Sequence, residues 1–331
     1  MEKERIEWVD IAKGIAIIAM IISHGCPKRA IVSFIFSFHM PLFFILSGYT
    51  SGQVLTWEKF KKKGVNAFFR VWLLAVLMIV LLGFETMFVN NLDSRLLFRN
   101  IFLSDLKGIF WGSNIQAINL MNVGVMWFLI VFFWSKILYN FFQVCFDNKY
   151  NGFYLGILSY LFFNISKIHW LPQAFDIVPI AAFFMWCGWY LKKVNKTFDY
   201  SNSLITLLLI GGTFIYWIAC IQRGLYIDMS VRHYPSFIFS ILEAVAGTIC
   251  VCFMSVSLLK TKKVKFLSVL GKHTLALLCI HHLDLFWIWW GKLIPQWYVT
   301  LIIRLILDLT MLWLYLWIRK QLTMKRGKIN G

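Results

Sequence analysis

Stretches of about 20 mostly apolar residues recur along the chain, separated by short polar segments, and each is long enough for a helix to cross a bilayer. Strands of a membrane barrel would alternate in polarity, whereas helices satisfy their own backbone hydrogen bonds in lipid. We therefore predict an all-α polytopic membrane protein of about ten transmembrane helices. The expected spans are approximately 6–25, 31–51, 71–89, 124–146, 152–168, 176–191, 203–222, 235–259, 270–291 and 297–318.

Composition agrees with this pattern. Of the 331 residues 60% are apolar and only 15% are charged, and the mean hydropathy is +0.71. We find no tandem repeat, soluble appendage or cleavable signal, so residues 1–331 are expected to form one membrane-embedded domain. The seven cysteines lack the spacing of a metal or disulfide framework, and we predict no metal.

The basic residues behind the net charge of +18 are distributed unevenly between the two sides of the predicted membrane topology. With the N-terminus inside, 20 of the 33 Lys and Arg residues fall in inner segments, nine fall in outer segments, and four lie in or at the edge of spans, Lys136 among them. An excess of positive charge on the cytoplasmic side is the rule for membrane proteins, so we expect both termini in the cytoplasm. The excess of basic residues therefore does not indicate a nucleic-acid-binding protein. The expected partner of these residues is the lipid bilayer.

The first expected span carries ionisable residues in DIAKGIAIIAMIISH. Lys13 and His24 are eleven residues apart, which places them about 16 Å apart along a helix and within about 20° of one face. Asp10 precedes Lys13 by three residues and can pair with it. An ion within a span is a candidate functional residue. The structural alternative is a snorkelling lysine and an interfacial histidine.

The second span contains His39 directly before Met40 and Pro41. Because the first two spans run antiparallel, His24 and His39 are expected at similar depths below the outer surface. Two converging imidazoles favour a functional site over simple packing.

Later spans carry further charges. His281 and Asp284 share a helix face, and Arg304 and Asp308 have the spacing of a structural pair. Glu243 has no local partner. These residues are predicted to support the site or the packing.

Two connecting segments are informative. Residues 52–70 are basic and partly amphipathic, and we expect a cytoplasmic connector that lies on lipid. Residues 90–123 form the longest outer loop, whose aromatic and amide side chains suit a hydroxyl-rich ligand. These side chains are Trp111, Asn114, Gln116, Asn119 and Asn122.

This arrangement permits two functions. Histidines along a buried path could carry protons for a transporter of a small polar solute or saccharide. Alternatively, a histidine could act as general base while cations hold an anionic, phosphate-bearing donor from the cytosol. A donor with a pantetheine-like arm could bind its phosphates near Lys13 and place its thioester beside His24, because the arm is long enough for the distance between these residues.

The chain resembles the acyltransferase-3 integral-membrane O-acyltransferases, particularly the fucose 4-O-acetylase-like branch. The resemblance covers essentially the whole chain and is carried by RIEWVDIAKGIAIIAMIISH, FSFHMPLFFILSGY, the basic segment ending at Arg70, VMWFL, and LGKHTLALLCIHH. Lysine stands at position 13, where the family more often has arginine.

The resemblance implies that acetyl-CoA, or another acyl-CoA, is the donor and that a hydroxyl of a cell-envelope saccharide is the acceptor. It implies His24 as the catalytic residue, with Lys13 and Arg70 supporting the donor. We further expect His39 to orient the acceptor or stabilise the oxyanion, with Asp10, His281 and Glu243 in supporting positions. The expected location is a bacterial plasma membrane, and a second copy or a separate extracytoplasmic protein is a candidate partner.

Overall fold

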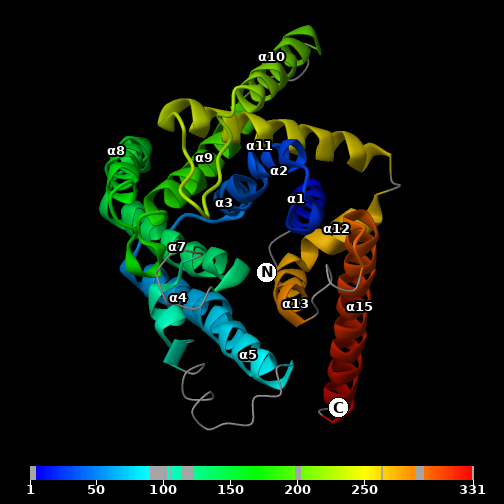
Figure 1. The fold of residues 1–331 in the computed structure, drawn as a ribbon. Helices are drawn as coiled ribbons and strands as arrows, with labels where there is room; N and C mark the ends of the chain where they lie inside the picture. Colours follow the sequence, from blue (N-terminus) through cyan, green and yellow to red (C-terminus); the bar gives the residue numbers. More distant parts are fainter. Residues whose placement is uncertain are drawn as a thin grey trace.

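The computed structural model describes residues 5–89, 103–104, 106–113, 123–197, 203–261, 264–287 and 294–329. Helices form its whole scaffold over these residues (Figure 1). The longer helices are α1 (Glu7–Gly25), α2 (Arg29–Phe36), α3 (His39–Thr50), α4 (Trp57–Ala67), α5 (Leu73–Val89), α7 (Trp127–Cys145), α8 (Asn148–Ser166), α9 (Val178–Thr197), α10 (Ser203–Gln222), α11 (Phe237–Lys260), α12 (Lys265–Lys272), α13 (Thr274–Trp287) and α15 (Trp297–Ile329).

The prediction of an all-α polytopic membrane protein is confirmed. Among the described residues, eight helices are long and apolar enough to cross a membrane, and a ninth is obtained if the bent pair α12 and α13 is one span. That pair bends by 77°. The expected span near 152–168 corresponds to α8, which is 19 residues long but is not among the eight.

The helix that contains the third expected span begins before the span itself. A π-helical turn, Phe68–Trp72, joins α4 directly to α5, and the helix Trp57–Glu85 contains an apolar stretch long enough to cross a membrane. Trp57 and Phe68 contact Phe141 and Phe133 of α7 at ring distances of 6.0 and 6.2 Å, and both remain partly exposed. Residues 52–70 thus pack on α7 on one side, and their role as a cytoplasmic connector that lies on lipid stays a prediction.

Glycines let the helices around the site approach closely. A Cβ atom at Gly14 of α1 would collide with the backbone of Leu267, and one at Gly271 of α12 with the backbone of Asp10. Gly48 and Gly188 make the same contact between α3 and α9. Small residues at a helix interface allow this backbone contact in membrane proteins. They fix α1 and α3, which carry the candidate histidines.

The N-terminal helices lie in the middle of the molecule. Figure 1 shows α1, α2 and α3 in blue between α9 and α11 on one side and α12 and α13 on the other. These neighbours are in contact, since α1 packs on α11 and α12 and α3 packs on α9. The helices that carry Lys13, His24 and His39 are therefore placed at the centre of the bundle.

Candidate active site

A cavity of about 660 Å³ lies between these central helices. Its volume is within the range of small-molecule sites, about 300–1,000 Å³. Its wall comes from α1, α3, α7, α13 and the loop between α10 and α11. The lining residues include Lys13, His24, Phe36, His39, Phe43, Ser47, Thr50, Ser51, Val71, Gly124, Trp127, Phe128, Phe132, Lys136, Asp228, Ser230 and Thr274.

The cavity has two ends of different chemistry. Lys13 lies near the start of α1, and Thr50 lies at the end of α3. These two helix ends are adjacent, because the rings of Trp8 and Tyr49 are 5.2 Å apart. The opposite end is formed by Phe36, by Gly124 just before α7, and by the loop after α10. The cavity thus runs along the bundle, with His24 and His39 on its wall.

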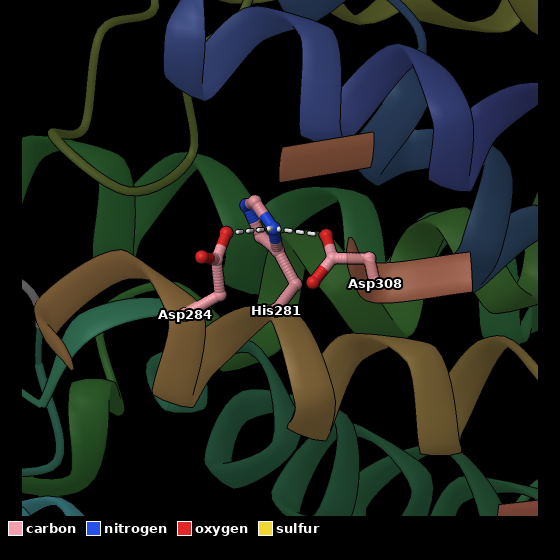
Figure 2. A group of neighbouring side chains, drawn as sticks. All are labelled: His281, Asp284 and Asp308. Atoms are coloured by element: carbon pink, nitrogen blue, oxygen red, sulfur yellow. Dashed lines mark hydrogen bonds and ion pairs between the residues drawn. The ribbon is translucent and has the colours of Figure 1, made fainter. Parts of the chain in front are cut away.

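His24 is held from behind by a chain of buried side chains. Its Nδ1 is 3.1 Å from Nε2 of His281, on α13. The Nδ1 of His281 is 2.8 Å from Oδ2 of Asp308, on α15. His281 and Asp308 are fully buried, and Figure 2 shows His281 between Asp308 and Asp284. Side chains of α13 and α15, which lie far from α1 in the sequence, thus position the imidazole of His24, the one ring of this group that lines the cavity.

The hydrogen bonds define the protonation pattern. A carboxylate only accepts hydrogen bonds, so Nδ1 of His281 donates to Asp308 and its Nε2 accepts. His24 then donates from Nδ1 to His281, and its own Nε2 is left without a proton. His24 thus has an unprotonated Nε2, and its Nδ1 is hydrogen-bonded to a histidine that is itself bonded to a carboxylate. This is the arrangement of a general base.

Asp284 completes the buried cluster with a second pair. Arg304 of α15 donates from Nε to Oδ2 of Asp284 at 2.8 Å. Ligand atoms of His281, Asp284 and Asp308 lie within 4.8 Å of one another, a spacing that a metal ion could use. In the structure Arg304 balances the charge of Asp284, and Asp308 accepts a hydrogen bond from Nδ1 of His281.

The partners within this cluster differ from those that helical spacing predicted. We expected Arg304 to pair with Asp308, but Arg304 bonds to Asp284 and it is His281 that bonds to Asp308. The predicted shared face of His281 and Asp284 is present, since Nδ1 of His281 lies 3.9 Å from Oδ2 of Asp284. Packing of α13 against α15 brings better-aligned partners than the local spacing offers.

His39 has a defined orientation. Its Nδ1 donates to the carbonyl oxygen of Ile35 at 2.9 Å, so the neutral ring presents Nε2 as a hydrogen-bond acceptor. His39 lines the cavity together with His24. This tautomer suits a residue that orients a hydroxyl group, rather than one that donates to an oxyanion.

The other predicted site residues lie in different surroundings. Lys13 lines the cavity, but the ion pair of Asp10 is with Arg5, Nε to Oδ2 at 2.9 Å. Arg70 is exposed in the π-helical turn; its neighbour Val71 reaches the cavity wall, whereas Arg70 does not. Glu243 is fully buried on α11 and does not line the cavity.

Sequence reasoning missed two groups of lining residues. Lys136 lies in the middle of the apolar helix α7 and was assigned only to a span; its central position was the available signal. Asp228 and Ser230 lie in a loop that no motif singled out. Burial raises the pKa of the Asp228 carboxyl, and hydrogen bonds from Ser230 oppose this.

Part of the predicted outer loop is outside the described residues. Asn114, Gln116, Asn119 and Asn122 belong to this part, so their role in ligand binding stays a prediction. Trp111 is described and does not line the cavity.

Comparison with protein families identifies the family of the chain. Residues 6–322 match the model of the acyltransferase-3 family, described as an acyltransferase domain. Comparisons with curated proteins and with solved structures gave no match. The match extends over nearly all of the chain, from the start of α1 through the described transmembrane helices, and the chain therefore belongs to the acyltransferase-3 family of membrane acyltransferases.

Proposed function

We propose that this protein transfers an acetyl group from cytosolic acetyl-CoA to a hydroxyl group of a cell-envelope saccharide. The observation that carries the proposal is the composition of the cavity wall. One cavity contains cations toward one end and, on its wall, a histidine backed by His281 and Asp308. Resemblance to the fucose 4-O-acetylase-like branch favours acetyl as the acyl group and a sugar as the acceptor.

The donor enters at the end that carries Lys13, Lys136 and Thr50. Positive charges there bind the phosphate groups of the donor, and the pantetheine arm extends along α1. The distance of about 16 Å from Lys13 to His24 matches such an arm and places the thioester beside the imidazole. Arg70 is a further candidate for donor binding, at the entrance rather than in the cavity wall.

The chemical step is a direct transfer with His24 as general base. Nε2 of His24 takes the proton of the acceptor hydroxyl while the oxygen attacks the thioester carbonyl. The tetrahedral intermediate collapses, the C–S bond breaks, and the CoA thiolate receives the proton from His24. His281 and Asp308 stabilise the transient imidazolium, and Nε2 of His39 accepts a hydrogen bond that orients the acceptor.

Mass spectrometry of envelope polysaccharide tests the proposal. Acetyl increments present in cells with the gene should disappear in cells without it, and His24→Ala should fail to restore them although the protein accumulates normally. General base catalysis contributes about 10²–10⁴ in rate. His169→Ala is the matched control, because His169 is an exposed loop residue outside the cavity and should restore full acetylation.

A result of more than a tenth of normal acetylation with His24→Ala would contradict the assignment of His24. An unchanged acetyl profile combined with lost uptake of a sugar or amino acid would support the alternative, a proton-coupled transporter. The chain of His24, His281 and Asp308 is the observation that favours this alternative, because such a chain can also carry protons.

A further inference from the structure

The end of the cavity opposite Lys13 is lined by the loop between α10 and α11. Within this loop Asp228 and His233 form an antiparallel bridge through their backbones, N to O at 3.1 and 2.9 Å. Asp228, Ser230 and Val231 at its tip line the cavity. The loop therefore presents a carboxylate and a hydroxyl to the same space that His24 and His39 border.

A buried ion pair fixes this loop in place. Arg232 donates from Nε and Nη2 to the two carboxylate oxygens of Asp176 at 2.6 and 3.1 Å, and from Nη1 to Ser113 at 2.8 Å. The side chains of Arg232 and Asp176 are 4% and 0% exposed. The guanidinium also lies 3.7 Å from the ring centroid of Trp170.

The backbone of Arg232 has a positive φ of 57°. A non-glycine residue keeps this conformation only where its surroundings hold it, and such positions are concentrated at functional sites. Here the surroundings are the bonds of the guanidinium, including one from Nη1 to the carbonyl oxygen of Ser230 at 2.9 Å. The tip of the loop is therefore preorganised.

The tip offers hydrogen-bond acceptors to the cavity. Ser230 donates its backbone N–H and its hydroxyl to Oδ1 of Asp228 at 3.0 and 2.6 Å. With its proton used in this way, the oxygen of Ser230 is left as an acceptor, as is the carboxylate. A ligand at this end must supply donors, which sugar hydroxyls do, whereas phosphate and carboxylate groups would be repelled. Trp127 at the start of α7 adds an aromatic face for the apolar side of a sugar ring.

We propose that Asp228 and Ser230 form the binding subsite for the hydroxyl groups of a neutral saccharide acceptor. This inference rests on the proposed function and deepens it, because it assigns the two substrates to opposite ends of one cavity. The donor phosphates bind at Lys13 and Lys136, the acceptor sugar binds at the loop, and their reacting groups meet at His24.

Steady-state kinetics of the purified protein test the subsite. The donor is radiolabelled acetyl-CoA, and the acceptor is de-O-acetylated envelope glycan from cells that lack the gene. Asp228→Ala should raise the KM for the glycan about tenfold or more, and Ser230→Ala about threefold. The Kd for CoA, measured by calorimetry, should stay within about twofold of wild type, because the donor binds at the other end.

Two further variants separate binding from loop structure. Asp228→Asn keeps an oxygen that can accept both hydrogen bonds from Ser230, so it tests the subsite even if Asp228→Ala does not fold. Its KM for the glycan should rise about threefold, because a charged acceptor binds a hydroxyl more strongly than a neutral one. Asp147→Asn is the matched control, because Asp147 also accepts a local backbone N–H, from Lys149, but lines no part of the cavity.

A KM within twofold of wild type for both Asp228 variants would overturn the subsite while leaving the proposed function intact. A loss of CoA affinity equal to the loss of glycan affinity would also overturn it, since the residue would then act through the fold. No transfer by the wild-type protein to the glycan would overturn the proposed function and the subsite together.

Discussion

At the scale of single residues, the chemistry of His24 depends on its neighbours. A histidine in the last turn of α1 would ordinarily be an interfacial side chain. Its contact with His281, and the contact of His281 with Asp308, orient the ring and select the tautomer that presents Nε2 to the cavity. His281 and Asp308 are thus positioning residues, and neither lines the cavity.

Replacement of Asp308 by asparagine should therefore reduce turnover. An amide at this position can donate to Nδ1 of His281, which reverses the tautomers of both histidines and leaves a proton on Nε2 of His24. By analogy with the loss of the carboxylate from serine-protease triads, we expect kcat to fall by up to about 10⁴-fold, with KM and the Kd for CoA changed less than about threefold.

Asp308→Glu should recover part of kcat, since a carboxylate is restored. The pH profile of kcat is the second measurement, because loss of the carboxylate alters the protonation of His24. Normal kcat and an unchanged pH profile in Asp308→Asn would show that the carboxylate only supports packing.

At the scale of elements, α7 is an apolar helix with a lysine at its centre. Insertion of a lysine at the centre of a membrane helix costs about 2.5–3.5 kcal/mol. Lys136 lines the cavity, and its ammonium group lies 5.5 Å from the ring centroid of Phe132. Lys136 lies about 14 Å from the start of α7, and Lys13 lies about 18 Å from the end of α1. Two helices therefore present cations to the cavity at similar depths.

Lys136→Met should weaken binding of the donor through its phosphate groups. We expect the Kd for CoA to rise about tenfold or more, and Lys13→Ala to have a similar effect, because each removes a charge-assisted bond. Lys136→Arg should remain close to wild type. Lys167→Met is the matched control, since Lys167 also lies near an aromatic ring, 4.0 Å from the centroid of Phe163, but outside the cavity.

A donor without phosphate groups makes this measurement specific. Rates with S-acetyl-pantetheine should be the same for wild type and Lys136→Met. An equal loss with both donors would show that Lys136 affects folding or the reaction and not phosphate binding.

At the scale of the whole molecule, the cavity connects two ends of the bundle that the charge distribution predicts on opposite sides of the membrane. The proposed function requires this topology, because a cytosolic donor and an external acceptor must both reach one histidine. The basic segments near Lys149, Lys193 and Lys260 are predicted inside, and the loops that contain Lys167 and Asp228 outside.

Reporter fusions test this orientation. Fusions after Asp147, Lys193 and Thr261 should report the cytoplasm, whereas fusions after Lys167 and Arg223 should report the exterior, because the topology predicted from the sequence has α8, α9, α10 and α11 each cross the membrane once. An exterior signal after Thr261 would place the donor end of the cavity on the wrong side and would exclude cytosolic acetyl-CoA as the donor.

The sequence by itself determined the class of the protein and singled out two residues of the cavity wall. Continuous apolar stretches of the length of a bilayer specify helices whatever their neighbours, because lipid allows only helices and closed barrels, and barrel strands alternate in polarity. The eleven residues between Lys13 and His24 specify their distance because both lie on one rigid helix, and both do line the cavity. Where the relative position of two residues depends on a single helix, the sequence was sufficient to predict it.

Only the tertiary structure decided which side chains from different helices meet. Spacing within α15 predicted a pair of Arg304 with Asp308, but packing of α13 on α15 joined Arg304 to Asp284 and His281 to Asp308. In the same way, α4 continues through a π-helical turn into α5, and Arg70 in that turn lies outside the cavity wall. The loop with Asp228 is placed by an ion pair between residues 176 and 232. Such contacts are set by the geometry of several helices together, which no local pattern along the chain records.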